Sequence, residues 1–305
     1  MSTPKIIETA TTADDRILPL TRAVAWLVIP FLVAAFVILY VDGRHTADWF
    51  AWAIDSRLTT ALMGAGYLGG AYFFLRVALG PGRQHIHLGA GYTPDASYVA
   101  QRTAVRWHEV QVGYWPVTTF TVAMLLATLL HWDKFLTGNW PFWVWLVLYI
   151  VTPLLVPFVW WRNRPADPRT PRSGERLVPG WMRGVMGFAG GFLLVLSVAA
   201  FIRPDLITAV WPWTLSSLTA RVMAGWHALL GVGALTLGAE VRWSGWIIPM
   251  QSIAIWMGLM LLALRLHQAE LGAAGLSNWY TVFVLCGLLG LTAVWLLMRG
   301  REPLP

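Results

Sequence analysis

Residues 141–161 read PFWVWLVLYIVTPLLVPFVWW, a run of 21 residues without a charged side chain. An α-helix needs about 20 mainly apolar residues to cross the hydrocarbon core of a bilayer. Seven similar runs lie near residues 23–41, 58–79, 111–130, 184–202, 222–240, 246–265 and 279–298. These runs are far longer than the roughly 10 residues of a transmembrane β-strand. The sequence therefore predicts an all-α, polytopic membrane protein with eight transmembrane helices.

The composition of the whole chain supports this prediction. Of its 305 residues, 57% are hydrophobic and only 12% are charged, whereas soluble domains carry about 25% charged residues. A water-soluble fold is therefore excluded. The single cysteine, Cys286, excludes an internal disulfide and a thiolate metal cluster. The first 21 residues have no cleavage site beside an apolar stretch, so we expect a polar tail and not a signal peptide.

The positive charges predict the orientation of the chain. The segments on the same side as the two termini carry 16 Lys and Arg residues, and the segments on the other side carry 6. Because cytoplasmic loops are enriched in these residues, we expect both termini in the cytoplasm, which requires an even number of spans. Arginine greatly outnumbers lysine, as in GC-rich bacteria, so we expect a bacterial plasma (inner) membrane protein. The net charge of +7 is explained by this asymmetry, and we expect no nucleic acid partner.

Several stretches of the sequence occur twice in the same order. Trp52-Ala-Ile-Asp-Ser resembles Trp213-Thr-Leu-Ser-Ser, and Leu58-Thr59 matches Leu218-Thr219. The stretch that ends at His131 resembles the one that ends at His267, and the pair Arg22 and Arg183 has the same spacing as the two tryptophans. The sequence thus predicts two tandem four-helix repeats. An even number of spans in each repeat places both in the membrane the same way up, related by an axis along the membrane normal.

This interpretation divides the chain into five parts. They are a cytoplasmic tail (1–22), a first four-helix repeat (23–161) with a cytoplasmic insertion at about 80–106, an Arg- and Pro-rich linker (162–183), a second four-helix repeat (184–298) and a cytoplasmic tail (299–305).

Two aromatic loops on the outer side contain the first candidate ligand-binding residues, Trp52 and Trp213. With 20 tryptophans in the chain, many are expected to form the aromatic belt at the level of the lipid headgroups. The alternative is a short in-plane helix or lid over a cavity between helices. In that case Asp55 or Ser56, and Ser216 or Ser217, would cap the helices that follow.

Three histidines are further candidates for ligand binding. His131 and His267 end the third and seventh spans, so a repeat axis could bring them together. Imidazole can ligate haem, zinc or copper and can donate a hydrogen bond to a quinone. Interfacial histidines more often bond to loop backbone or headgroups. His227 is the ionisable side chain deepest within a span, and Tyr67 occupies the matching position of the other repeat.

A possible metal site lies on the cytoplasmic side. His85 and His87 form a His-x-His pair, and His108 and Glu109 follow within 25 residues. Such a set could chelate a metal ion, although the spacing matches no strong metal motif. The alternative is an insertion that faces solvent or headgroups, with arginines that attract anionic lipid.

The functional prediction depends on what the spans do not contain. No Asp or Glu lies in the middle of a span, which disfavours an ion-coupled transporter. The chain also has no phosphate-binding loop, no His-Glu-x-x-His and no Gly-x-Ser-x-Gly. We therefore expect a non-enzymatic membrane protein that binds or passes an apolar or neutral ligand, or scaffolds a complex with another membrane protein or a second copy. The alternatives are a histidine-ligated haem, quinone or metal protein and a lipid-modifying enzyme.

Overall fold

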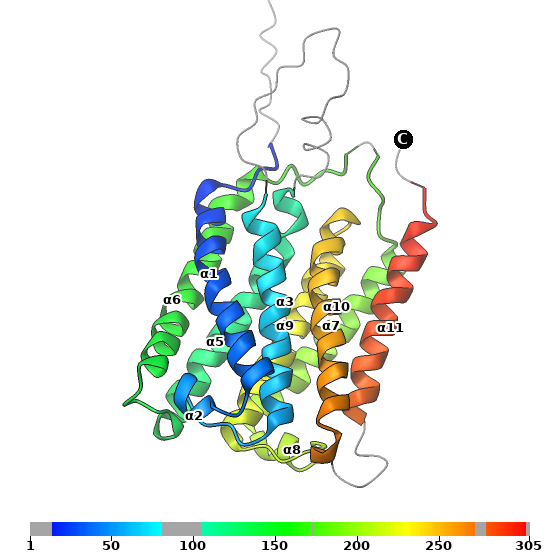
Figure 1. Ribbon diagram of the computed structural model, residues 1–305. Coiled ribbons are helices and arrows are strands. Elements are labelled where there is room, and N and C mark those ends of the chain that lie inside the picture. The colour runs from blue at the N-terminus through cyan, green and yellow to red at the C-terminus, as the bar shows by residue number, and fades with distance from the viewer. Residues whose placement is uncertain (1–13, 81–104, 173, 272–278, 303–305) are drawn as a thin grey trace, which may run out of the picture.

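The computed structural model describes residues 14–80, 105–172, 174–271 and 279–302. Eight of its helices are long and apolar enough to cross a membrane, and they run side by side as one bundle (Figure 1). Extended pairing among the described residues is limited to an isolated bridge between Leu177 and Arg242. The prediction of an all-α protein with eight transmembrane helices is confirmed.

The long helices are α1 (Pro19–Phe36, continued by the π-helical turn η1, Val37–Asp42), α3 (Arg57–Ala78), α5 (Tyr114–Leu130), α6 (Trp140–Asn163), α7 (Gly180–Ile202), α9 (Ser217–Ala239), α10 (Ser244–Leu266) and α11 (Trp279–Arg299). The short elements are α2 (Thr46–Trp49), η2 (Trp107–Glu109), η3 (Gln111–Gly113), η4 (Trp132–Lys134), η5 (Arg164–Ala166), α8 (Pro204–Thr208) and η6 (Gln268–Glu270).

The two ends of the bundle differ. The end with α2, α8, η4 and η6 is called here the short-helix end (bottom of Figure 1). The opposite end, called here the linker end, carries residues 14–18, 105–113 and 164–179, as well as the turn between α9 and α10. Because each pair of successive spans reverses direction, every connection lies at one of these two ends.

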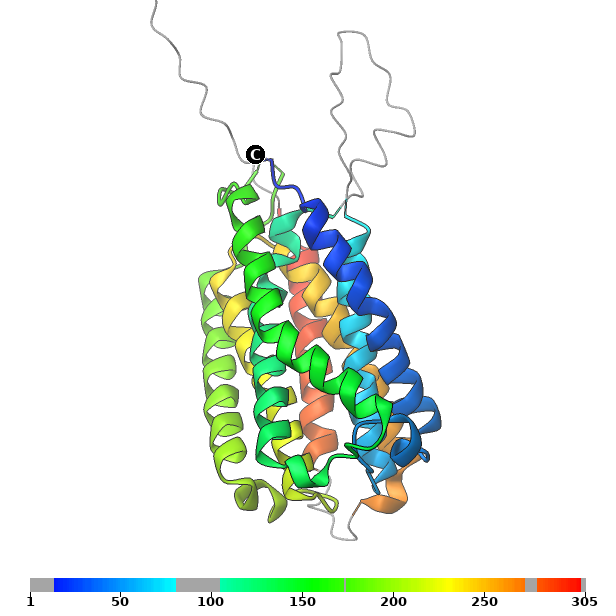
Figure 2. The ribbon, with the colours of Figure 1, turned by 90° about the vertical axis from the view of Figure 1, so that its left-hand side faces the viewer.

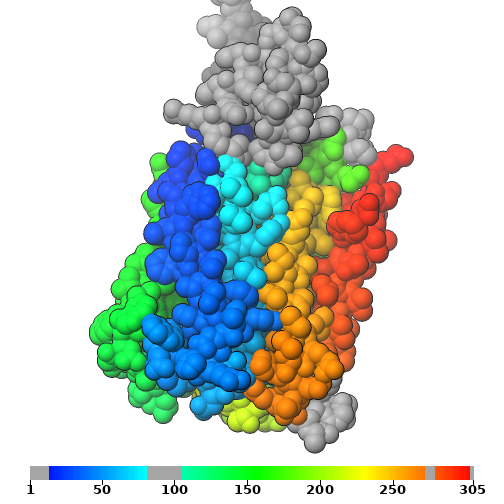
Figure 3. Space-filling view, viewed as in Figure 1, coloured from blue at the N-terminus to red at the C-terminus, as the bar shows by residue number. Residues whose placement is uncertain are grey.

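Helices α3, α5, α9 and α10 are more buried than the other four. In the most apolar 18-residue stretch of each span, 78% of the residues of α3 and 56% of those of α9 are buried inside the protein. The corresponding share is only 11% in each of α1, α7 and α11. Helices α5 and α10 lie between these extremes. Helices α1, α3, α10 and α11 form one face of the molecule, shown in Figure 3. The weakly buried helices present their apolar side chains outward, as expected where lipid is the solvent.

The contacts between the two halves of the chain are reciprocal. Helix α3 of the first half packs on α10 of the second, and α9 of the second half packs on α5 of the first. Gly69 of α3 allows the close approach to Trp256 of α10, and Gly225 of α9 lies against Met124 of α5. This exchange of neighbours is the arrangement that a parallel repeat predicts.

Small residues also allow α7 and α9 to touch through their backbones. A Cβ atom on Gly190 would lie 2.7 Å from the carbonyl oxygen of Gly231, and one on Gly238 would lie 3.0 Å from the amide nitrogen of Gly187. Contacts this close exclude any larger side chain without movement of the helices. The structure thus brings Gly187 and Gly190 of α7 against α9, with the tightest contact at Gly190.

Matching stretches of the two halves adopt matching local structures. The Ser56 hydroxyl accepts a hydrogen bond from the Thr59 N–H (3.0 Å), and the Ser216 hydroxyl accepts one from the Thr219 N–H (3.1 Å). Ser56 therefore caps α3 and Ser216 caps α9. Both were among the four candidate caps named from the sequence.

The matched arginines also play the same role. Arg22 of α1 donates to the carbonyl of Ala78 at the end of α3, and Arg183 of α7 donates to that of Gly238 at the end of α9, both at 3.0 Å. These correspondences agree with the tandem repeat, which itself stays a prediction.

Candidate functional site

A cavity of about 510 Å³ lies among the spans of the first half of the chain and the two inner helices of the second. Its walls come from α1, α3, α5, α6, α9 and α10, and no charged side chain lies among the residues that line it. Most of the lining is aliphatic or aromatic. A pocket of this chemistry fits an apolar molecule that has little net charge.

The cavity reaches the surface between α1 and α6. Phe31 of α1 and Trp140 of α6 both line it, and their exposed fractions are 38% and 63%. Figure 2 shows α6 (green) crossing the middle of this face, with α1 (blue) to its right. Since both are membrane spans by length and composition, this opening faces the region where lipid would lie. A ligand dissolved in the bilayer could enter without passing through water.

Several hydrogen-bond donors around this cavity have no acceptor. Trp226 and Trp256 line the cavity and are each 5% exposed, and within the described chain neither indole N–H has a partner. The hydroxyls of Tyr67 and Tyr149 lie 3.1 Å apart. Because only one of two paired hydroxyls can donate to the other, the second keeps a free proton. Buried donors without acceptors are unfavourable by about 1–3 kcal/mol each, so these groups favour a ligand with acceptor oxygens.

A second, more polar cavity of about 1020 Å³ lies at the short-helix end. The two predicted tryptophans, Trp52 and Trp213, both line it, as do the cap residues Ser56 and Ser216. The Trp213 indole donates to the hydroxyl of Thr59 (2.9 Å). The structure thus brings the two aromatic loops to one cavity, in agreement with the alternative of loops over a cavity between helices.

The predicted histidine pair is not brought together at this cavity. His131 lines it, but His267 is not among the residues that do. Nε2 of His131 lies 2.6 Å from the guanidinium of Arg221. Burial, together with the positive charge of Arg221, lowers the pKa of His131. The imidazole is therefore a neutral acceptor for Arg221, and a haem or metal bound at Nε2 would have to displace that arginine.

His227 of α9 is surrounded by aromatic side chains from α11 and from the loop that precedes α9. Its Nδ1 bonds to the carbonyl of Met223 (2.7 Å), and Nε2 lies 3.4 Å from the hydroxyl of Tyr280. The rings of Trp211 and Phe283 also lie within 6 Å of the imidazole ring, at 5.9 and 5.8 Å between centroids. Both ring nitrogens thus have partners inside the protein.

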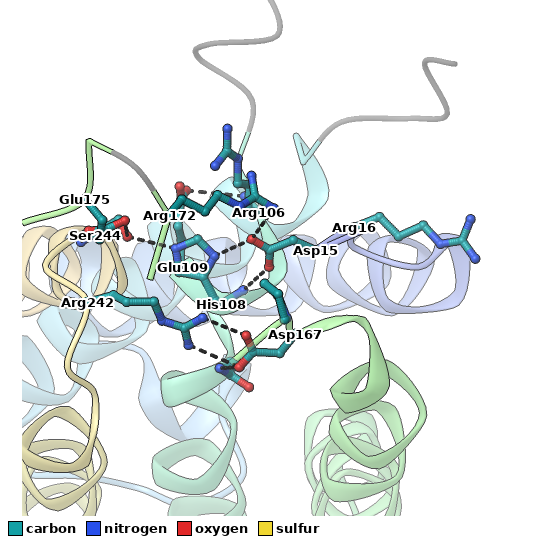
Figure 4. Close-up of polar contacts among 12 residues, drawn as sticks. Asp15, Arg16, Arg106, His108, Glu109, Asp167, Arg172, Glu175, Arg242 and Ser244 are labelled. Carbon is teal, nitrogen blue, oxygen red and sulfur yellow. Dashed lines mark hydrogen bonds and ion pairs between the residues drawn. The ribbon is translucent and has the colours of Figure 1, made fainter. Parts of the chain in front are cut away.

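The linker end holds a buried polar cluster around Asp15 and His108 (Figure 4). Both residues are at most 2% exposed. The Asp15 carboxylate lies 2.6 Å from Nδ1 of His108 and accepts the backbone N–H of the same residue (3.1 Å). Arg172 of the linker adds an ion pair at 3.2 Å. The cluster therefore joins the N-terminal tail, the segment before α5 and the linker.

The cluster continues to the start of α10. Nε2 of His108 lies 2.8 Å from the Ser244 hydroxyl, which donates to the Glu175 carboxylate at 2.9 Å. The order Asp15, His108, Ser244 resembles a catalytic triad in outline. A hydroxyl has one proton, however, and that of Ser244 goes to Glu175. With its proton engaged by Glu175, this hydroxyl is not free to act as a nucleophile, and the arrangement ties α10 to the linker.

A second group of charges lies beside this cluster. Arg242 donates to both carboxylate oxygens of Asp167 (2.7 and 3.1 Å) and to both of Glu240 (2.8 and 2.8 Å). Burial raises the pKa of Asp167, but the hydrogen bonds from Arg242, the Arg169 N–H and Gln111 outweigh it and lower the pKa to about 2. Asp167 is thus held ionised, and it fixes the linker to the turn between α9 and α10.

The predicted metal ligands are only partly described. His85 and His87 lie outside the described residues. Both ring nitrogens of His108 are hydrogen-bonded, as described above, and Glu109 accepts the N–H of Arg106 (3.3 Å). Burial raises the pKa of Glu109. Among the described residues, no group of three or more His, Cys, Asp or Glu side chains is placed to hold a metal ion.

Comparison of the chain with protein families, with characterised proteins and with solved structures finds no match. The fold and the two cavities define an eight-helix, multi-pass membrane protein, and its function has to be argued from these sites.

Proposed function

We propose that the protein binds a neutral, lipid-soluble molecule that carries acceptor oxygens, such as a carbonyl or ether lipid, in the cavity between α1 and α6. The absence of charged residues from its lining disfavours an ionic ligand. Its opening between two spans favours a ligand that partitions into the bilayer. The protein would then be a binding or passage protein for this ligand and not an enzyme.

One observation carries the proposal. The indole N–H groups of Trp226 and Trp256 are buried beside an apolar cavity with no acceptor in the described chain. Buried donors are almost always paired in folded proteins. A bound molecule with an oxygen atom near each indole would pair them, and the free proton of the Tyr67 and Tyr149 pair could bind a further oxygen.

The orientation proposed from the sequence assigns sides to the two ends. With the arginine-rich linker in the cytoplasm, the linker end is cytoplasmic and the short-helix end faces the outside of a bacterial inner membrane. The cavity between α1 and α6 then lies within the hydrocarbon layer. A reporter fused after Pro305 should behave as cytoplasmic, and a periplasmic signal would contradict this assignment.

The ligand can be sought directly. The full chain would be purified in lipid nanodiscs, and its bound lipids extracted and compared by mass spectrometry with those of empty nanodiscs made from the same membranes. We expect enrichment of one class of uncharged, oxygen-containing lipid. The double variant Trp226→Phe, Trp256→Phe removes both N–H groups and should lower this enrichment at least about tenfold, since two hydrogen bonds at about 1 kcal/mol each are lost.

The control is Trp181→Phe, which changes a tryptophan of α7 that is 60% exposed and does not line the cavity. It should leave the enrichment unchanged. A further variant, Ala35→Phe, places a large side chain in the cavity wall and should also displace the ligand. Equal enrichment in all four proteins would overturn the proposal.

A further inference from the structure

Two helix N-termini meet at the polar cavity of the short-helix end, and one of them already holds a carboxylate. Glu270 accepts a hydrogen bond from the Ser56 hydroxyl (2.6 Å) and another from the Leu58 N–H (3.1 Å). The first N–H groups of a helix have no partner within the helix, and the helix dipole favours negative charge there. Glu270 of the second half of the chain therefore completes the start of α3.

The start of α9 has the same form without the carboxylate. Ser216 caps it as Ser56 caps α3, and Leu218 stands where Leu58 stands. No side chain of the described residues accepts from the Leu218 N–H. The residue that corresponds to Glu270 in the other half is Lys134, which lines the same cavity as Ser216, Ser217 and Leu218. A cation thus lies where the other half supplies an anion.

A buried indole donor in the same wall is an independent observation. Trp213 donates to Thr59 near the start of α3, as described above. Trp52, its counterpart, lines the cavity and is only 2% exposed, yet its N–H has no partner among the described residues. The hydroxyl of Thr219, which corresponds to Thr59, is paired with Ser216 instead (2.9 Å). Among the described residues, the Trp52 N–H therefore lacks the acceptor that its counterpart has.

We infer that the start of α9 is a binding site for a carboxylate-bearing solute. The carboxylate would accept from the free N–H groups at Ser217 and Leu218 and would lie near the Lys134 ammonium, as Glu270 does at α3 without the lysine. The site opens toward the short-helix end, so the solute arrives from water. It is separate from the lipid cavity and does not depend on the function proposed for that cavity.

The other charged groups of the cavity agree with this assignment. The negative charge of Glu270 is already compensated by its hydrogen bonds to the start of α3. The charge of the exposed Asp55 is screened by solvent. His131 is neutral and bonded to Arg221, which brings a further positive charge near the first turns of α9. Lys134 pairs only with Asp133 (3.0 Å), and both side chains are more than 60% exposed. Such a surface pair is weak, which leaves Lys134 able to turn toward a ligand.

Acetate is the simplest probe of this site. Its binding to the full chain in nanodiscs would be titrated by saturation-transfer NMR at constant ionic strength, with chloride as the replaced anion and methylammonium as the cationic control. We expect saturable acetate binding and none of methylammonium. Lys134→Gln should weaken acetate binding about threefold or more by loss of the charge, and Lys134→Glu should abolish it because the new carboxylate competes for the site.

Asp133→Asn is the matched control, because it changes the neighbouring exposed residue and frees Lys134 from its ion pair. Its acetate affinity should be equal to or greater than that of the wild type. Trp52→Phe, which removes the indole N–H and keeps an aromatic ring in the same place, should weaken acetate binding without unfolding the protein. Acetate binding that is unchanged by Lys134→Glu, or that never saturates, would overturn the assignment.

Discussion

The two ends of this helix bundle both collect polar side chains, but they pack differently. At the linker end, Asp15, Asp167 and Arg242 each bond to two or more partners, and neither cavity is lined by them. At the short-helix end, a large cavity lies among the polar groups. Buried donors without an acceptor in the described chain occur at both ends, at Trp52 and at Trp107. The contacts of the linker end thus hold the two halves of the chain together, whereas the short-helix end carries the cavity for which we propose a ligand.

The largest effect is expected at the linker end. Asp15→Asn removes the charge that pairs with Arg172 and His108 in a site that is 1% exposed. Breaking a buried ion pair by changing one partner destabilises a protein by about 3–5 kcal/mol. Unfolding in mixed detergent micelles, followed by circular dichroism, would measure the loss. The neighbouring Asp14 is exposed and bonds only locally to Arg16, so Asp14→Asn is the control, and equal effects of the two variants would contradict a locking role.

The next effect concerns the pH dependence of the same end. The pKa of Asp167 is lowered to about 2 from an ordinary value of 3.8. A depressed pKa in the folded state stabilises the protein above the ordinary pKa, and this stabilisation is lost as the pH falls toward 2. This stabilisation amounts to at most about 2.5 kcal/mol. We therefore expect Asp167→Asn to be less stable than the wild type at pH 6, with the difference closing in acid. A gap that stays constant from pH 6 to pH 2 would exclude this origin.

A smaller effect tests the comparison between the two helix N-termini of the short-helix end. Glu270→Ala deletes the carboxylate at the start of α3 and should lower the free energy of unfolding by about 1–2 kcal/mol. Added acetate should restore part of this loss, because a free carboxylate can occupy the emptied position. The control is Asp133→Ala, which deletes a fully exposed carboxylate. If acetate raises the stability of both variants equally, the rescue is not specific to the helix terminus.

The smallest effect separates the two tryptophans of the cavity. Trp213→Phe removes a hydrogen bond to the buried hydroxyl of Thr59, whereas Trp52→Phe removes an N–H that has no acceptor. The change in ring size is the same in both variants, so their difference isolates one hydrogen bond, about 1 kcal/mol. Thermal unfolding of the two variants without ligand should rank Trp213→Phe as the less stable. The reverse order would mean that Trp52 has a partner.

The spans could be predicted from the sequence because membrane helices leave a direct signature in length and hydropathy. The helix boundaries differ from the expected ones by at most five residues. The caps Ser56 and Ser216 were predictable too, because N-cap chemistry is local. A lid over a cavity was one of two interpretations of the loops of Trp52 and Trp213, but the sequence did not predict that both residues line the same cavity.

Other features could not be predicted because they depend on contacts between distant residues. Asp15 lies in a polar tail and meets His108, 93 positions away, only in the folded protein. Trp226 and Trp256 lie in apolar spans where a tryptophan is ordinarily a core or interfacial residue, and the sequence contains no sign that their N–H groups lack partners. Of the two predicted histidines, only His131 lines the cavity, and sequence spacing alone does not determine this.

The cluster around Asp15 also has a consequence for biosynthesis. Its chain of contacts runs from the N-terminal tail through His108 to Ser244, which is a further 136 positions along the chain. At about 5–20 residues per second, the ribosome needs roughly 10–45 s to make the last of these partners after the first. During that time, the first four helices are already available to the membrane while Asp15 still lacks a completed cluster. The contacts that fasten the two halves together can therefore form only after Ser244 has been made, well after the first four helices.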